Sequence, residues 1–541
     1  PWPTTMLRAG RAWQLRGMDS SPTTGLIARL RQALGEAAVL TDEAERRFFS
    51  QDIAGSGATA AVVVRPGRVE DLCTAVRLAT EAGHAVLARG GGSSYTAGFV
   101  PDRADSMVLD MRGLGRVLAV DEADMRVTVE AGCTWQNLLA ELEPRGLRTP
   151  FWGPLSGAVA TVGGSLSQHA ILWGSARHGV SADSVIGLEV VLADGRLLAT
   201  GAGAARRGTP FLRHYGPDLT GLFLGDCGAL GVKARATLRL VRQPGAVGTA
   251  SFGFDRREAL AAAMCDVARS GLATECFGMD PTLQRQRLKR ASLAQGMKAL
   301  KGVVAGEGLL AGLKDAARVA LAGRGFLDEV PYSMHVGTEW PDEAGVERAL
   351  AELGRIAVRH SGREVPDSVP KLMRGAKYVS MTSAIGPEGE RWLPVHALLP
   401  LSDVADAWAE VTALFDAHAE GFRRHGIEVG VLTAVVGAGA FALEPVFYWP
   451  APRTEYYLRL FDEKTLAGFE DFPPNPEGEA LVFEVRRRLI ALFLARGAAH
   501  LQAGKTYPYR DGVGPTAFAL LEAVKRAVDP RRLMNPGALG L

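Results

Sequence analysis

Short apolar runs alternate with amphipathic segments from about residue 60 onward. The apolar run at residues 61–64 predicts a strand that ends before Pro66, and apolar positions at helical spacing predict a helix over residues 69–82. The Ala-Asp-Gly sequence after residue 192 indicates a hairpin turn. Further strands are predicted at residues 85–88, 106–109, 126–129, 187–192 and 232–241. This mixture of βαβ units and hairpins predicts an α+β domain that ends near residue 245.

The pattern changes after residue 245. Longer helices are predicted at residues 256–269, 403–418 and 480–495, and separate strands at residues 332–337, 396–399 and 429–436. Helices and strands that segregate in this way indicate a second α+β domain. The Pro- and Gly-rich stretch at residues 472–478 predicts a surface loop.

Composition narrows the class of protein. A chain of 541 residues allows three or four domains of about 150 residues each, and 47% hydrophobic with 22% charged residues is typical of a globular protein. The net charge of +2 gives no reason to expect a nucleic-acid partner. Five dispersed cysteines without a CxxC pair disfavour a disulfide framework or a zinc site and fit a reducing compartment. With no run of 18 apolar residues and no signal-peptide pattern in residues 1–20, we expect a cytoplasmic protein.

A glycine-rich loop at residues 89–94 follows a predicted strand directly. Its three consecutive glycines allow positive φ and a close approach of the backbone to a ligand, and free N–H groups in such a loop bind phosphate oxygens. The loop is not a GxGxxG motif that opens a helix, and a tight turn without function is the alternative. Two further glycine-rich turns, at residues 161–165 and 225–232, favour one long dinucleotide that contacts all three.

The order of these segments resembles the vanillyl-alcohol oxidase/p-cresol methylhydroxylase superfamily of FAD-linked oxidases, whose FAD-binding domain is called PCMH-type. The matching pieces are the triple-glycine loop, VGGSLSQ, LEVVLADG, GALGV and a terminal NPG, within residues 55–245 and 529–537. The resemblance implies a PCMH-type FAD-binding domain of two α/β subdomains at residues 55–245 and an α+β cap domain with an antiparallel sheet at residues 246–500. Residues 1–54 would be an N-terminal extension with a helix, and residues 501–541 would return to the FAD domain.

The resemblance also implies which residues bind FAD. The pyrophosphate would lie against Arg89, Gly90, Gly91, Gly92, Ser93 and Ser94. Gly163, Gly164 and Ser167 would line the ribityl chain and diphosphate. Gly228 and Val232 would lie near the adenine half and Asn535 near the isoalloxazine.

The sequence differs from better-known members of this superfamily at several positions, and these differences limit how FAD can be attached and which reactions are expected. Ser93 stands where some members carry the histidine that binds flavin covalently, so we expect FAD that is not linked at Ser93 and is non-covalent. Residues 151–163 contain neither the cysteine of bicovalent members nor the aspartate of phenol oxidisers, and Gly-Ala-Ala precedes His500 in place of a Tyr-Arg pair. The GEHG metal motif is also missing at residues 500–505, so no metal site is expected.

Candidate catalytic groups in the cap come from three clusters. His396 interrupts an apolar stretch at residues 392–400, with a satisfied core histidine as the alternative. Tyr448 follows Glu444 within residues 443–450, which taken alone fits a packed strand end. His500 and Lys505 belong to a donor-rich segment at residues 500–510, where Lys505 and Arg510 are candidates for holding a substrate carboxylate or the charge of reduced flavin.

A basic segment at residues 283–324 holds nine Lys and Arg residues against two acids, a local net charge of +7. Its apolar residues follow helical spacing. A solvated face on the cap, contact with an anionic membrane surface, and an acidic electron-transfer partner are the three interpretations. Peripheral attachment at the inner membrane surface is therefore an alternative to a purely cytoplasmic location.

Together these features predict an FAD-dependent oxidoreductase that transfers a hydride from a small alcohol or hydroxyacid to flavin N5. Electrons would then pass to oxygen, a quinone or a cytochrome. A 2-hydroxyacid dehydrogenase of glycolate or D-lactate type is the alternative enzyme. A flavin-binding electron-transfer subunit is the non-enzyme alternative. No nucleic-acid partner is expected.

Overall fold

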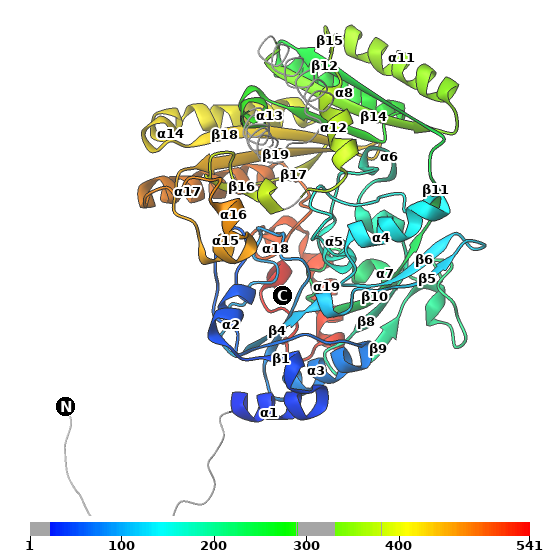
Figure 1. Cartoon of the computed structure of the whole chain (residues 1–541), viewed down its shortest axis with the longest axis vertical. Coiled ribbons are helices and arrows are strands. Elements are labelled where there is room, and N and C mark those ends of the chain that lie inside the picture. The colour runs from blue at the N-terminus through cyan, green and yellow to red at the C-terminus, as the bar shows by residue number, and fades with distance from the viewer. Residues whose placement is uncertain (1–21, 288, 290–329, 380) are drawn as a thin grey trace, which may run out of the picture.

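The computed structural model describes residues 22–287, 289, 330–379 and 381–541. Most of the basic segment at residues 283–324 lies outside the described residues. Two small sheets formed by the first half of the chain lie below one large sheet formed by the second half (Figure 1). No helix in the described ranges is long and apolar enough to cross a membrane.

The first small sheet has four strands in the order β1-β2-β4-β3. They are β1 (Val39–Leu40), β2 (Val62–Val64), β3 (Ala85–Arg89) and β4 (Ser106–Asp110). The pairs β2–β4 and β3–β4 are parallel, and helix α3 (Val69–Glu81) is the crossover between β2 and β3. The apolar spacing that predicted this helix buries Val69, Leu72 and Val76 in the core, as expected for an amphipathic crossover. Helices α1 (Pro22–Leu34) and α2 (Glu43–Phe49) precede the sheet strands β2–β4.

The second small sheet is antiparallel, with five strands in the order β5-β6-β10-β8-β9. They are β5 (Val117–Asp121), β6 (Arg126–Glu130), β8 (Val185–Val191), β9 (Leu197–Ala199) and β10 (Val232–Arg239). The hairpin predicted after residue 192 joins β8 to β9, where Gly195 adopts a φ of +80°. Short helices α4 (Trp135–Leu142), α5 (Val162–Gln168), α6 (Ser175–His178) and α7 (Leu219–Leu222) lie in its connections, and β7 (Leu147–Arg148) pairs with β11 (Val241–Arg242).

The large sheet has eight strands in the order β15-β12-β14-β13-β18-β19-β16, with β17 also paired to β19. They are β12 (Ala246–Phe254), β13 (Glu275–Met279), β14 (Tyr332–Trp340), β15 (Arg363–Val365), β16 (Arg391–Pro394), β17 (Ala397–Pro400), β18 (Glu428–Val436) and β19 (Ala440–Trp449). Every pairing within it is antiparallel, so the second half has the α+β character that its segregated pattern predicts.

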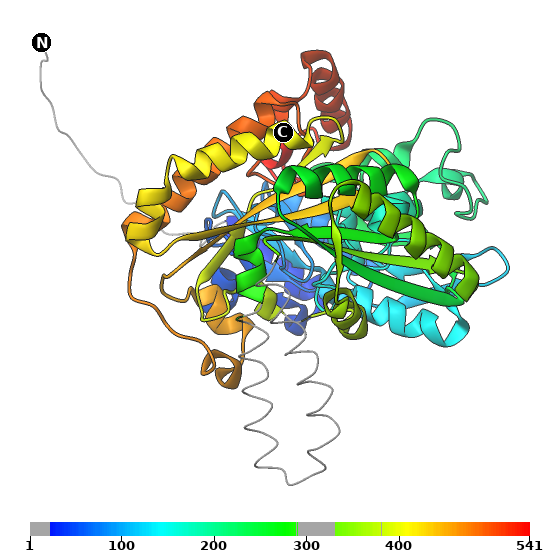
Figure 2. The same cartoon turned by 90° about the horizontal axis from the view of Figure 1, so that it is seen from above.

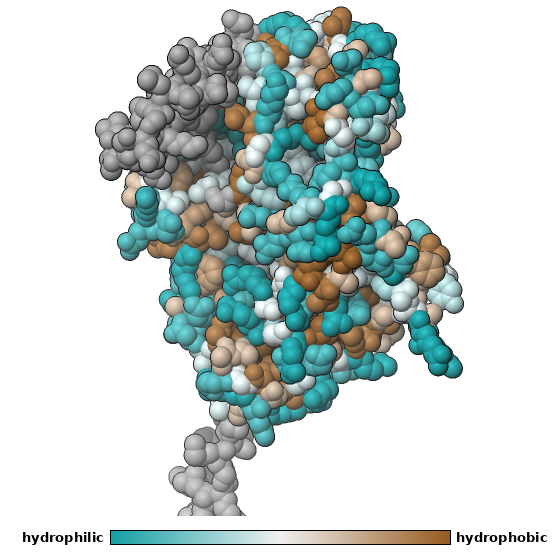
Figure 3. All heavy atoms as spheres, turned by 45° about the vertical axis from the view of Figure 1, so that its right-hand side comes forward, coloured by the Kyte–Doolittle hydropathy of each residue, from teal (hydrophilic) through white to brown (hydrophobic). Residues whose placement is uncertain are grey.

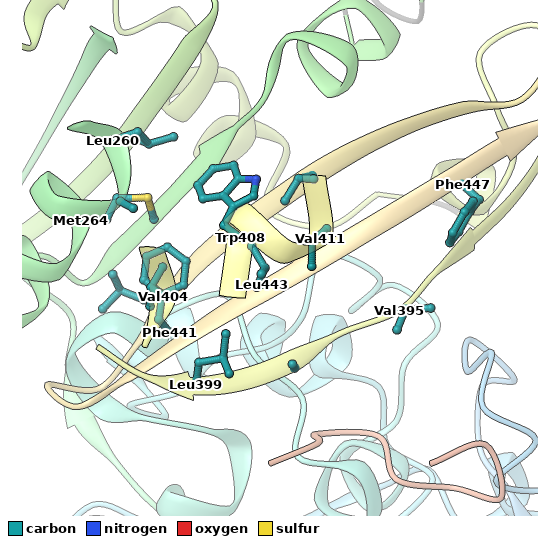
Figure 4. Close-up of a cluster of buried hydrophobic side chains, with 14 of the residues drawn as sticks. Leu260, Met264, Val395, Leu399, Val404, Trp408, Val411, Phe441, Leu443 and Phe447 are labelled. Carbon is teal, nitrogen blue, oxygen red and sulfur yellow. The ribbon is translucent and has the colours of Figure 1, made fainter. Parts of the chain in front are cut away.

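Helices cover the face of the large sheet that points away from the small sheets (Figures 1 and 2). They include α8 (Arg257–Ser270), α11 (Glu343–Arg359), α13 (Val404–Asp416), α14 (Ala419–His425) and α17 (Pro476–Ala495). Figure 4 shows the core between them, where Trp408 of α13 lies among side chains of α8 and β19. The loop predicted at residues 472–478 is interrupted by α17, which begins at Pro476 because Asn475 caps it by accepting from Gly478 N.

The C-terminal residues return to the first sheet. Leu533 O accepts from Val86 N at 2.8 Å, and Asn535 N donates to Val86 O at 2.9 Å. The remaining helices are α12 (Ser368–Ala376), α15 (Glu455–Leu460), α16 (Glu463–Leu466), α18 (Tyr509–Gly512) and α19 (Pro515–Val528). The exact division into domains at residues 55, 245 and 500 stays a prediction.

Candidate functional site

A cavity of about 710 Å³ lies between the small sheets and the large sheet. Its lower wall is formed by the three glycine-rich turns. Ten of the predicted cofactor residues line it: Gly90, Gly91, Gly92, Ser93, Ser94, Gly163, Gly164, Ser167, Gly228 and Val232. The structure therefore brings together three turns that are spread between residues 89 and 232 and places them on one wall of one cavity.

Tight packing explains why two of these positions are glycines. A Cβ at Gly91 would lie 1.9 Å from Val159 O, and a Cβ at Gly90 would lie 2.2 Å from Thr161 Oγ1. Gly92 adopts a φ of +78°, a conformation that residues with a side chain rarely adopt. The loop thus packs directly on the segment before α5. This contact requires glycine at positions 90 and 91 before any ligand is considered, and the positive φ favours glycine at position 92.

Arg89 and Asn535 do not line the cavity but support its wall. The Arg89 guanidinium is buried between Phe48 and Phe49, with its carbon 4.7 Å from the centre of each ring, and it donates to Tyr456 Oη. Asn535 Nδ2 donates to Gly98 O at 2.6 Å and to Cys227 O at 2.5 Å. Asn535 thereby ties the C-terminal segment to two loops of the cavity.

The upper wall is one face of the large sheet. Glu275, Phe277 and Met279 alternate along β13, because successive side chains of a strand point to opposite faces. In register beside them, Leu432 of β18 pairs with Met279 and with Glu444 of β19. This face carries two carboxylates, Glu275 and Glu444, on an otherwise apolar surface.

The two carboxylates have different environments. Glu275 is buried, accepts from Gly174 N at 3.0 Å and forms an ion pair with Arg374, which also bonds Glu339. Burial raises the pKa of Glu275, while the Arg374 charge opposes that rise. Its negative charge is compensated within the protein.

Glu444 makes no hydrogen bond or ion pair with another residue in the part of the chain that the structure describes, and it lines the cavity. Burial raises its pKa from 4.5 to about 7, and the charge of Arg287, which also lines the cavity, acts in the opposite direction. Glu444 is therefore a carboxyl group that changes charge near neutral pH and faces the cavity.

His396 lines the cavity but is held by neighbouring residues on both ring nitrogens. Its Nε2 accepts from Gln502 N at 3.1 Å, so the ring proton is assigned to Nδ1, which lies 3.2 Å from Tyr507 Oη. Burial and the nearby His500 lower the pKa of His396 to about 3. The ring is therefore neutral at physiological pH, and the lone pair that would accept a proton is occupied.

The other three predicted catalytic residues lie off the cavity. His500 Nδ1 donates to His396 O, and its ring stacks on Tyr507 at 4.0 Å. Tyr448 is buried beside Val446 and Met279. Lys505 Nζ donates to Val100 O and to Asp102 Oδ2, each at 2.8 Å. Arg510 lies over the ring of Phe518. Their catalytic roles stay predictions that the geometry does not favour.

A polar network that the sequence did not single out joins the glycine loop to the C-terminal segment. Ser94 Oγ donates to Gln168 Oε1 at 3.0 Å and lies 3.3 Å from Gln502 Oε1. Gln502 Nε2 in turn donates to Tyr95 Oη at 3.1 Å. The network fixes the side of the cavity where the small sheets, the large sheet and the C-terminal segment meet.

Free polar groups on the lower wall suit a phosphate-bearing ligand. The half-buried Ser93 lines the cavity and makes no side-chain hydrogen bond among the residues described. His169, which also lines it, has a buried Nδ1 without a partner in the same described set. A buried polar group is normally hydrogen-bonded, so these positions fit a ligand that supplies the missing partners. The size of the cavity also lies in the range of small-molecule sites.

Glycine-rich turns that line one wall of a cavity are suited to bind the phosphates of a cofactor through their backbone N–H groups. Residues 60–201 match the family described as FAD binding domain, and residues 504–539 match that described as FAD linked oxidases, C-terminal domain. These two segments therefore match an FAD-binding domain and the C-terminal domain of FAD-linked oxidases, which supports FAD as the cofactor.

Curated relatives match less than half of the chain. The glycolate oxidase subunit GlcD of Bacillus subtilis is 29% identical over 223 residues, which are 41% of this chain and 46% of that protein. D-lactate dehydrogenase [cytochrome] 1 of Saccharomyces cerevisiae is 27% identical over 39% of this chain and 35% of its own length. D-2-hydroxyglutarate dehydrogenase of Danio rerio is 33% identical over 36% of this chain and 34% of its own length. The chain thus spans less than half the length of these relatives.

Solved structures match almost the whole chain. 4-Ethylphenol oxidase from Gulosibacter chungangensis and p-cresol methylhydroxylase each superpose with a TM-score of 0.72 at 16% identity, over 97% of this chain and 98% of theirs. Alkyldihydroxyacetonephosphate synthase superposes with a TM-score of 0.66 at 15% identity, over 95% of this chain and 84% of its own. At this identity the likeness establishes the α+β fold alone.

Proposed function

We propose that this protein is an FAD-dependent oxidoreductase that oxidises the carbon bearing a hydroxyl group in a small organic molecule. The observation that carries the proposal is the position of Glu444, which faces the cavity from the wall opposite the glycine-rich turns. In this proposal residues 55–245 and 501–541 form the FAD domain and residues 246–500 form the cap that holds the substrate.

Glu444 would accept the hydroxyl proton of the substrate. Its pKa of about 7 lies near the operating pH, where a general base is most effective, and no ion pair with a described residue holds it in the charged form. Bound FAD supplies the acceptor for the hydride that leaves the same carbon. The apolar side chains around Glu444, including Met279 and Leu432, exclude water from the substrate and strengthen its contacts.

Arg287 supports a 2-hydroxyacid as the second candidate substrate. Its side chain is exposed where it lines the cavity, and a guanidinium binds a carboxylate through two parallel hydrogen bonds. The names of the relatives, which include glycolate oxidase and D-lactate dehydrogenase, agree with this reading. With a 2-hydroxyacid as substrate, Arg287 would bind the substrate carboxylate and Glu444 would accept the hydroxyl proton.

The proposed attachment of FAD is non-covalent. Serine at position 93 offers no ring nitrogen, and both nitrogens of His396 lie within hydrogen-bond distance of protein groups. Acid precipitation should therefore release the yellow colour to the supernatant. A yellow pellet would contradict non-covalent binding and would direct attention to another histidine of the cavity, His169.

Electrons would leave the flavin to oxygen, a quinone or a cytochrome, and the location would be the cytoplasm or an inner membrane surface. An electron-transfer subunit without its own substrate is the alternative. The test is to mix the protein anaerobically with a panel of alcohols, 2-hydroxyacids and amines and to measure the flavin absorbance near 450 nm. Bleaching by an alcohol or hydroxyacid is expected, and a flavin that stays yellow with the whole panel would overturn the enzymatic proposal.

A further inference from the structure

An apolar and basic patch protrudes from the second small sheet. It is formed by the loop at residues 205–218, which connects the turn after β9 to α7, and by the first residue of that helix. Phe211 and Tyr215 are each 62% exposed, Leu212 is 46% exposed and Leu219 is 41% exposed. Four large exposed apolar side chains within nine residues exceed what scattered surface residues explain.

The same loop carries excess positive charge. Arg206, Arg207 and His214 are exposed, and neither of these arginines forms an ion pair with a residue that the structure describes. Arg213 is neutralised by Asp218 at 2.9 Å. Three arginines against one aspartate leave the loop with a net charge of +2 before His214 is counted.

Hydrogen bonds hold the loop in the shape that exposes these side chains. Arg213 Nη1 donates to Ala182 O at 3.1 Å, and Arg126 Nη1 donates to Pro210 O at 3.2 Å. Asp218 caps α7 by accepting from Gly221 N. Ala202 N also donates to Leu212 O at 2.8 Å. These bonds fix the loop in a conformation in which Phe211, Leu212 and Tyr215 are exposed.

The loop extends from the flank of the molecule beside β9 (Figures 1 and 2). When that flank is turned forward, apolar side chains reach the surface among hydrophilic ones (Figure 3). Aromatic rings with basic neighbours are the combination that suits the headgroup region of a bilayer, where rings enter the interface and cations meet anionic lipids.

We propose that the 205–219 patch docks the protein on a membrane surface that contains anionic phospholipid. Phe211 and Tyr215 would enter the headgroup layer, and Arg206 and Arg207 would bind lipid phosphates. The proposal is independent of the oxidoreductase function. It is also independent of residues 290–329, which lie outside the described residues.

The test is co-sedimentation of the full-length, FAD-loaded protein with vesicles of phosphatidylcholine alone or mixed with phosphatidylglycerol. We expect binding to the anionic vesicles that weakens with added salt. F211S/Y215S should reduce the partition coefficient by about tenfold or more, because two aromatic side chains no longer enter the interface. R206Q/R207Q should reduce it by roughly 25-fold at low salt, from about fivefold for each charge.

Matched controls separate the patch from general surface hydrophobicity. Leu520 of α19 is 69% exposed and Val358 of α11 is 68% exposed, so L520S and V358S should leave vesicle binding and flavin content unchanged. The proposal is overturned if the wild-type protein ignores anionic vesicles, or if F211S/Y215S binds as the controls do. Concentration-dependent dimers that F211S/Y215S abolishes, seen by light scattering, would overturn it in favour of a second copy as the occupant.

Discussion

Replacing Glu444 by glutamine should change the stability of the protein in a pH-dependent way. Burial raises the pKa of this carboxyl from 4.5 to about 7 in the folded protein. Below pH 4.5 the carboxyl group is protonated in both the folded and the unfolded state, so its burial as a charge does not lower the free energy of unfolding. Between pH 4.5 and 7 the unfolded chain releases its proton first, and the free energy of unfolding falls as pH rises. Above pH 7 the cost levels off at about 3 kcal/mol, which corresponds to the difference between the two pKa values.

The assay is urea denaturation of wild type and E444Q at pH 5 and pH 8.5, with equal flavin content. The stability of E444Q relative to wild type should increase by up to about 3 kcal/mol between the two pH values. Glu347, exposed on α11, is the matched control, and E347Q should stay within about 0.5 kcal/mol of wild type at both. An equal difference between E444Q and wild type at pH 5 and pH 8.5 would refute the reasoning, because it would mean that Glu444 is not desolvated.

Three further substitutions test the wall of the cavity and the residues behind it. G91V should lower the bound FAD to less than about a tenth of the wild-type amount, because a Cβ at position 91 would lie 1.9 Å from Val159 O. The ratio of absorbance at 450 nm to that at 280 nm measures the bound FAD. G439V is the control and should retain FAD, because a Cβ at position 439 has no neighbouring atom within 4 Å. N535A should cost about 2–3 kcal/mol in urea denaturation, because two buried carbonyls lose the Nδ2 donor; an unchanged midpoint would contradict this. K505M should cost about 1–2 kcal/mol and leave the substrate KM unchanged, since the ammonium is bound to Val100 O and Asp102; a tenfold rise in KM would instead show that Lys505 binds substrate.

The sequence predicts the lower wall of the site better than the upper one. Its glycine-rich turns are local signals, and the backbone freedom that they provide is needed for local contacts such as that of Gly91 with Val159. The hairpin between β8 and β9 is predicted for the same reason, since Gly195 adopts the positive φ that such a turn requires. Turns and helices that are determined by a few neighbouring residues can therefore be predicted from the sequence pattern.

The upper wall depends on contacts between distant parts of the chain. His396 is held by Gln502 and Tyr507, which follow it by more than 100 residues, and no local pattern indicates these partners. Glu444 had a signal, because it is a single acid in the apolar strand at residues 440–449, yet period-two alternation places Tyr448 on the same face. Only the packing of the strand end distinguishes the residue that faces the cavity from the one that is covered.

The central claim is that Glu444 accepts the hydroxyl proton of the substrate. The most direct test is the rate of flavin reduction, measured as a function of pH by single-turnover anaerobic mixing. Once the panel has identified a substrate, the wild-type rate should rise with pH and level off above about 7, as Glu444 becomes ionised. E444Q should lower the plateau by about 10²–10⁴-fold and remove this pH dependence, while E347Q should reproduce the wild-type curve. If E444Q instead reduced flavin at the wild-type rate with the wild-type pH profile, Glu444 would not be the proton acceptor.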